Sequence, residues 1–175
     1  MKVVSFAGYS GSGKTTLVEC LIGVMRLRGL RVSVIKHAHH NFDIDKPGKD
    51  SWRHREAGAF EVLVASNQRM VLQRQFEQPT QLSVHHWLAE VWHGVDWVLV
   101  EGFKQSDLPK VEVWRHASGQ PVRYMNDDFI VAIATDSPSQ MPAPTQRPLL
   151  DLNDADAVCD WLLANQDRFE YKSPL

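Results

Sequence analysis

The pattern of hydrophobic and polar positions along this chain predicts strands and helices in alternation. Short apolar runs at Val3–Ala7 and Val32–Ile35 predict strands, and the continuous apolar run at Trp97–Val100 is typical of a strand buried on both faces of a sheet. After the first run, apolar residues recur at helical spacing, and Gly29 then provides a C-terminal stop. The apolar positions of this helix are Leu17, Leu21, Val24 and Met25.

The rest of the chain continues the alternation. Val62–Ala65 and Met70–Leu72 are predicted to form a hairpin, and residues 84–92 an amphipathic helix. Further predicted elements are strands at Val111–Trp114, Ile130–Ile133 and Leu149–Leu150, and a last helix capped by Asn153 or Asp154. This order predicts an α/β fold with a mainly parallel β-sheet flanked by helices. No repeat or linker divides the chain, so one domain over residues 1–175 is expected.

A glycine-rich segment, Gly8–Thr15, directly follows the first predicted strand and opens the first predicted helix. Its pattern, Gly-x-x-x-x-Gly-Lys-Thr, is that of a P-loop (Walker A), so the fold is expected to be P-loop NTPase-like. Glycines allow successive backbone N–H groups to surround a phosphate, and the helix N-terminus adds positive potential. Lys14 is expected to reach the β- and γ-phosphates and Thr15 to ligate Mg²⁺.

An acidic residue follows another buried strand. Glu101 ends the apolar run that begins at Trp97, so it is expected at the sheet edge that carries the glycine-rich loop. There it could hold Mg²⁺ through water or orient a water molecule. Asp96 precedes the same strand and is therefore expected at the opposite edge, away from the loop.

The segment after the second strand, residues 36–51, is rich in functional side chains and leaves three readings open. His37, His39 and His40 could bind a transition metal together with Asp43 or Asp45. The carboxylates could instead approach Mg²⁺ at the nucleotide, or the segment could be a solvated loop that contacts a second ligand or a protein.

Composition narrows the classes of partner. The net charge is −2 over 175 residues, so there is no basic excess to attract nucleic acid or an anionic membrane. No apolar stretch has the length of a membrane span, and no secretory leader is seen. Cys20 and Cys159 are distant in sequence and are expected to be buried thiols in a reducing, cytoplasmic compartment.

Taken together, these motifs resemble the MobB family, the molybdopterin-guanine dinucleotide biosynthesis adaptors. The resemblance extends over nearly the whole chain and is carried by several segments in family order. These are Gly8–Thr16, Ile35–His40, Asp43–Ser51, Arg55–Ala59, Leu99–Lys104, Pro109–Val111, Ile133–Asp136 and Leu150–Asp154.

The resemblance implies a homodimeric GTP-binding adaptor with weak, Mg²⁺-dependent GTPase activity. It also implies a partner, the MobA-type guanylyltransferase that joins GMP to molybdopterin, with molybdopterin as a further ligand. By position, Lys14 and Glu101 would serve hydrolysis, and Thr15 and Glu101 would serve Mg²⁺. The phosphates would be held by Ser10, Gly11, Ser12, Gly13, Lys14, Thr15 and Thr16.

The chain has no Asn-Lys-x-Asp motif of the kind that reads guanine in better-known GTPases. Asp136, after the strand that begins at Ile130, is the candidate to accept hydrogen bonds from guanine N1–H and the 2-amino group. Two other functions remain open: a P-loop kinase or nucleotidyl-donating enzyme acting on a pterin, suggested by the basic residues between Lys46 and Arg55, and a metal-delivery GTPase, suggested by the histidines.

Overall fold

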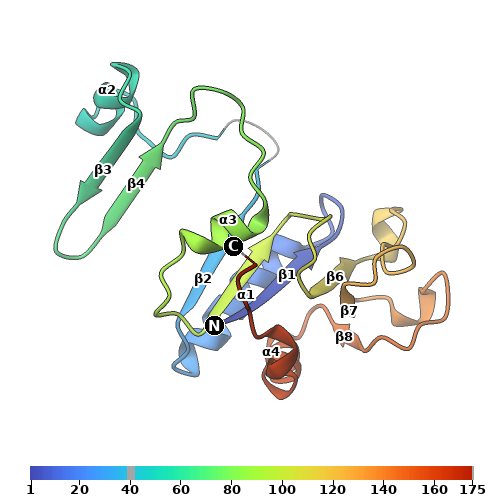
Figure 1. Ribbon diagram of the computed structural model, residues 1–175. Coiled ribbons are helices and arrows are strands. Elements are labelled where there is room, and N and C mark those ends of the chain that lie inside the picture. The colour runs from blue at the N-terminus through green and yellow to red at the C-terminus, as the bar shows by residue number, and fades with distance from the viewer. Residues whose placement is uncertain (39–41, 175) are drawn as a thin grey trace. The chain divides into compact units, whose positions relative to one another are not determined.

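The computed structural model describes residues 1–38 and 42–174 and divides the chain into two compact units (Figure 1). The first, here called the sheet unit, comprises Met1–His37 and Ser83–Leu175, and the second, the hairpin unit, comprises Ala38–Leu82. The expectation of a single domain over residues 1–175 stays a prediction. His39 and His40 lie outside the described residues.

The sheet unit is built on a six-stranded sheet with the order β2-β5-β1-β6-β7-β8, and every neighbouring pair is parallel. This confirms the predicted α/β fold with a mainly parallel sheet. The strands are β1 (Lys2–Ala7), β2 (Val32–Lys36), β5 (Trp97–Glu101), β6 (Lys110–Trp114), β7 (Ile130–Thr135) and β8 (Leu149–Asp151).

Helices flank the sheet on both faces, as the side chains of β5 show by alternating between two hydrophobic clusters. Leu99 of β5 packs into the cluster that contains α1 (Lys14–Leu27) and α4 (Ala155–Ala164). Its neighbour Val98 packs into the cluster that contains α3 (Val84–Ala89). Three short 3₁₀ helices complete the unit: η1 (His116–Ser118), η2 (Pro138–Gln140) and η3 (Gln166–Phe169).

Local signals account for the helix ends. The side chain of Asp154 accepts a hydrogen bond from the Ala157 N–H at 2.9 Å, as expected of the predicted cap of α4. Gly29 has φ 79°, the left-handed conformation that ends a helix without steric cost.

The hairpin unit contains α2 (Asp50–Glu56) and two antiparallel strands, β3 (Glu61–Ala65) and β4 (Met70–Arg74). The predicted hairpin is therefore confirmed, with each strand extended slightly beyond its apolar run. Leu63 lies opposite Leu72, and Ala65 lies opposite Met70.

Two expectations about single elements were wrong. The helix expected over residues 84–92 ends at Ala89, because the N–H groups of Glu90 and Val91 bond three residues back and tighten the last turn. Trp92 therefore lies beyond the helix and is 79 % exposed. Cys159 is buried as expected, but Cys20 is exposed, because it lies off the apolar stripe of α1. Within the described residues, no helix combines the length and apolar character that crossing a membrane requires.

Candidate functional site

The carboxyl ends of the parallel strands bring the predicted site residues to one edge of the sheet. Phe6 of β1 is in register with Glu101 of β5, which is in register with Lys36 of β2. The glycine-rich loop begins directly after β1, so Glu101 and Lys36 end their strands beside it. Ligands of open α/β sheets bind at this edge.

The loop needs glycine where its backbone comes closest to a neighbouring strand. A Cβ atom on Gly8 would lie 2.5 Å from the Val113 carbonyl oxygen, closer than real side chains approach. Gly11 and Gly13 have φ of 79° and 98°, a region that other residues rarely adopt. Gly13 directly precedes α1, so the positive end of that helix faces the loop.

The loop also contains a buried hydroxyl group without a hydrogen-bond partner. Ser12 is 3 % exposed, and its Oγ atom bonds no group among the described residues. A buried polar atom of this kind is costly unless it finds a partner. A phosphate oxygen inside the loop would provide one, so the loop fits the group that its sequence predicts.

Lys14 lies folded against its own loop. Its Nζ atom donates a hydrogen bond to the Tyr9 carbonyl oxygen at 2.7 Å. Burial lowers the pKa of the Lys14 ammonium, and so do the nearby charges of Lys104 and Lys36, while Glu101 acts in the opposite direction. An anion in the loop would offset both the burial and the repulsion between the lysines.

Thr15 and Glu101 are joined directly. The Thr15 hydroxyl donates to Glu101 Oε1 at 2.7 Å, and the Lys36 ammonium lies 3.3 Å from the same oxygen. A hydroxyl and a carboxylate at this spacing are oxygen ligands of the kind that Mg²⁺ prefers, either directly or through water. The pair therefore fits the predicted metal ion.

An arginine from the end of β6 connects Asp136 to the loop. Arg115 Nε donates to the Ser12 carbonyl oxygen at 3.2 Å, and its Nη1 atom pairs with Asp136 Oδ2. Ser137 Oγ donates to the other carboxylate oxygen of Asp136 at 2.7 Å. The Ser137 hydroxyl and the Arg115 charge hold the pKa of Asp136 below its usual range. Both oxygens of the predicted guanine-reading acid therefore have partners within the chain.

Of the remaining predicted residues, Ser10, Gly11 and Thr16 are exposed around the loop and the start of α1. Sequence reasoning missed Arg115, although its position directly after a strand of the sheet was a usable signal. The sequence marks Lys36 only as the start of a polar segment. Its contact with Glu101 depends on β2 and β5 being neighbours, which the sequence does not reveal.

Of the three histidines in the polar segment, the structure describes His37 alone. The His37 ring lies 4.6 Å from the Phe103 ring, while His39 and His40 lie outside the described residues. Among residues 1–38 and 42–174, no three His, Cys, Asp or Glu side chains are grouped as metal ligands.

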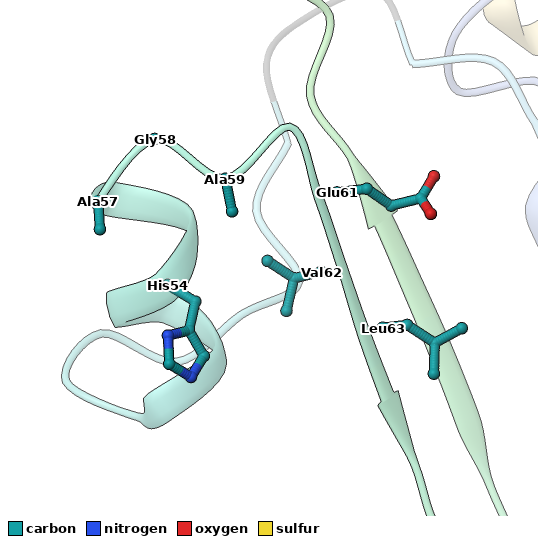
Figure 2. A pocket seen from close by; sticks show the side chains of 7 residues that line it. All are labelled: His54, Ala57, Gly58, Ala59, Glu61, Val62 and Leu63. Carbon is teal, nitrogen blue, oxygen red and sulfur yellow. The ribbon is translucent and has the colours of Figure 1, made fainter.

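A separate hollow lies within the hairpin unit, between the end of α2 and β3 (Figure 2). Val62 points toward α2, whereas Glu61 and Leu63 point to the other side of the strand, as alternation along a strand requires. The residues that line the hollow come from the end of α2, the connection that follows and the start of β3. Its lining residues are His54, Ala57, Gly58, Ala59, Glu61, Val62 and Leu63.

A parallel sheet, a glycine-rich loop between β1 and α1, and an acid at the end of β5 define a P-loop NTPase-like protein. Comparison with known proteins narrows this class. The family model described as molybdopterin guanine dinucleotide synthesis protein B, MobB, matches residues 3–136. The chain belongs to the MobB family.

Individual relatives agree with this assignment. The molybdopterin-guanine dinucleotide biosynthesis adapter protein of Haemophilus influenzae is 41 % identical over 162 residues, which are 91 % of this chain and 86 % of that protein. The Escherichia coli protein of the same name is 37 % identical over 92 % of this chain and 91 % of its own. A crystal structure of a MobB homolog from Bacillus stearothermophilus superposes with a TM-score of 0.70, at 27 % identity, over 95 % of this chain and 99 % of the other.

Proposed function

We propose that this protein is a GTP-binding adapter with weak GTPase activity that assists the attachment of GMP to molybdopterin. The proposal rests on family membership and on the loop that ends in Lys14 and Thr15. The single observation that carries it is the 2.7 Å bond between Thr15 Oγ1 and Glu101 Oε1 beside that loop, where a Mg²⁺–triphosphate would bind.

In this proposal the chain's own residues hold and orient the nucleotide. The loop from Ser10 to Thr16 binds the phosphates, with Lys14 as the cation that neutralises them. Thr15 and Glu101 hold Mg²⁺, which supplies charge neutralisation at the phosphates when bound. Glu101 is already bonded to Thr15 and lies beside Lys36, so its position is restricted to the loop side of the sheet edge.

Binding of Mg²⁺·GTP to the purified protein tests the site. We expect Lys14→Ala to abolish binding, whereas Lys172→Ala, an exposed lysine near the C-terminus, should leave it intact. Unchanged affinity in Lys14→Ala would exclude the loop as the nucleotide site.

Guanine reading by Asp136 is a finer part of the same proposal. This role is supported by the position of Asp136 directly after β7 and by its connection to the loop through Arg115. Its carboxylate would have to exchange the Ser137 hydroxyl for guanine N1–H. Asp136→Asn is expected to reduce the preference for GTP over ATP, and an unchanged preference would remove Asp136 from this role.

The adapter role predicts a partner of the MobA guanylyltransferase type and a cytoplasmic location. Relatives from Haemophilus influenzae and Escherichia coli are named as molybdopterin-guanine dinucleotide biosynthesis adapter proteins. The protein should increase the yield of guanylated molybdopterin when added to MobA, GTP and molybdopterin. Product formation by this chain without MobA would instead favour the alternative of an enzyme that acts on a pterin.

We also propose a homodimer, supported by an apolar face of the hairpin unit. Leu63, Leu72, Ala65 and Met70 lie on one side of the two strands, opposite the side that faces α2. Leu63 is 57 % exposed and Met70 is 64 % exposed. An isolated two-stranded hairpin is marginally stable in water, so a second copy covering this face would stabilise it.

Light scattering tests the dimer. Wild-type protein is expected at twice the chain mass, and Leu63→Lys, which adds a charge to the apolar face, should give the monomer. Gln68→Lys, in the exposed turn of the hairpin, is the matched control and should remain dimeric. A wild-type monomer at high concentration would contradict the proposal.

A further inference from the structure

Two cations lie over the ring of Tyr9, the second residue of the glycine-rich loop. Lys104 Nζ is 5.6 Å from the ring centroid, and the guanidinium carbon of Arg123 is 5.9 Å from it. These distances are within the range of cation–π attraction. Among the described residues, neither side chain forms an ion pair with a carboxylate. Both side chains thus bring positive charge to the loop, and Arg123 also interacts electrostatically with the buried Glu112 carboxylate.

Lys104 is brought to the loop by an unusual turn after β5. Gly102 has φ 104°, and Phe103, the one non-glycine residue described with positive φ, has φ 48°. A bulky residue in this conformation is strained, and such strain is concentrated at functional sites. The Phe103 ring packs 4.6 Å from the His37 ring, and a Cβ on Gly102 would lie 2.8 Å from the His37 Cβ. The packing thus maintains a turn that the sequence alone would not favour.

Arg123 is brought to the loop by a segment between β6 and β7 that is anchored by buried polar groups. The Glu112 carboxylate, which is 1 % exposed, accepts hydrogen bonds from the Arg123 N–H at 2.6 Å and the Tyr124 N–H at 2.9 Å. Asp127, four residues after Arg123, pairs with the buried ammonium group of Lys110 at 2.9 Å. The Arg123 Nε atom is itself buried and has no hydrogen-bond partner among the described residues. The backbone of Arg123 is therefore anchored, and its side chain still has an N–H group available to donate to a ligand.

The position of Tyr9 indicates which part of a nucleotide these cations would meet. Lys14 Nζ, the group that reaches the β- and γ-phosphates in P-loops, lies 2.7 Å from the Tyr9 carbonyl oxygen. The charge of Lys104 is close enough to Lys14 to lower its pKa. The Tyr9 side of the loop is thus the side of the terminal phosphates.

We infer that Lys104 and Arg123, held over Tyr9, bind the terminal phosphate of a nucleoside triphosphate and distinguish it from the diphosphate. This inference rests on the proposed nucleotide binding and adds a specificity for the phosphate number. Charge-assisted bonds from a lysine and an arginine to a γ-phosphate are present with GTP and absent with GDP. The protein would then bind the two nucleotides with different affinity, through side chains outside the glycine-rich loop.

Calorimetric titration with Mg²⁺ and either a non-hydrolysable GTP analogue or GDP tests this inference. Lys104→Met and Arg123→Met should each weaken binding of the analogue by about tenfold or more, the effect of one lost charged contact. GDP binding should stay within about twofold of wild type on the same reasoning. Lys104→Arg keeps the charge and should retain most of the preference for the triphosphate. Lys172→Met and Arg26→Met, exposed cations elsewhere in the sheet unit, are matched controls and should change neither affinity.

Each outcome separates this inference from the proposed function. If both nucleotides bind to wild type but the two variants weaken them equally, or not at all, Lys104 and Arg123 do not contact the terminal phosphate. If wild type binds neither nucleotide, the proposed function fails, and this inference fails with it. Arg123→Met retains its backbone N–H for Glu112, and normal GDP binding shows that the variant is folded.

Discussion

Substitution of the buried residue Glu112 tests most directly what holds the segment that carries Arg123, between β6 and β7, in place. The change we consider is Glu112→Gln, which keeps the shape of the side chain and replaces one oxygen by an NH₂ group. The two oxygens of Glu112 now accept from the backbone N–H groups of Arg123 and Tyr124. A glutamine can accept from only one of them, and its NH₂ group would face the other donor.

The size of the effect follows from that mismatch. A buried N–H that loses its acceptor costs about 1–3 kcal/mol, and no water can replace the acceptor at a residue that is 1 % exposed. For a chain of this size, each kcal/mol lowers the melting temperature by roughly 2–4 °C. The control is Glu19→Gln on the exposed face of α1, which should change the melting temperature by less than about 1 °C.

The effect should also depend on pH, in a direction fixed by the pKa of Glu112. Burial raises this pKa above the ordinary glutamate value of 4.5, against the opposing effect of the two N–H bonds. When the pH exceeds the pKa that Glu112 has in the unfolded chain, Glu112 loses its proton in the unfolded chain but keeps it in the folded chain. The contribution of Glu112 to stability therefore decreases as the pH rises. The difference in unfolding free energy between wild type and Glu112→Gln should therefore be largest at acid pH and smaller at alkaline pH.

Urea denaturation of both proteins, at about pH 5 and about pH 8, measures this difference. Taking the difference removes the contributions of the other carboxylates, which both proteins share. A variant that matches wild type within about 0.5 kcal/mol at both pH values would refute the reasoning, because it would mean that the N–H groups of Arg123 and Tyr124 do not depend on Glu112.

Two further predictions concern the metal ligand and the buried ion pair. Thr15→Val removes one of the two proposed oxygen ligands, so the gain in GTP affinity that Mg²⁺ provides should become smaller; an unchanged ratio of affinities with Mg²⁺ and with EDTA would contradict this. Asp127→Ala leaves the Lys110 ammonium buried without its carboxylate and should lower the free energy of unfolding by about 3 kcal/mol, as measured in urea. Asp156→Ala, which removes an exposed partner of Arg28, should leave the urea midpoint unchanged, and equal effects of the two changes would show that burial is not what matters.

Much of the fold followed from the sequence because its signals are local. The apolar run of β5, the hairpin of β3 and β4, and the Asp154 cap each depend on residues within a few positions of one another. The end of α3 was not predictable in the same way. Trp92 continues the helical spacing of apolar residues, but the chain tightens into a turn before reaching it. The exposure of Cys20 likewise depends on which arc of α1 packs on the sheet.

The residues of the candidate site differ in the same way: some are revealed by local sequence patterns, and others are brought together only by the tertiary fold. The Gly8–Thr15 segment and Glu101 could be recognised because the chemistry requires a fixed spacing or a fixed place at a strand end. The approach of Arg115, Arg123 and Lys104 to the loop could not, since it depends on the order of β5, β1 and β6 in the sheet and on how the connecting segments fold back. These side chains come from segments about a hundred residues after the loop, and local sequence patterns cannot predict contacts between segments so far apart.

The strand order has a consequence for how the chain is made. In the sheet, β1 pairs with β5 and β6, and β2 pairs with β5, so neither of the first two strands pairs with the other. A ribosome must therefore synthesise the whole segment from His37 to Asp96 before either strand has its partner. The β3–β4 hairpin within that segment pairs locally and can form as it emerges. We expect the apolar strand β1 to stay exposed during this interval, which makes the nascent N-terminal half a target for chaperones.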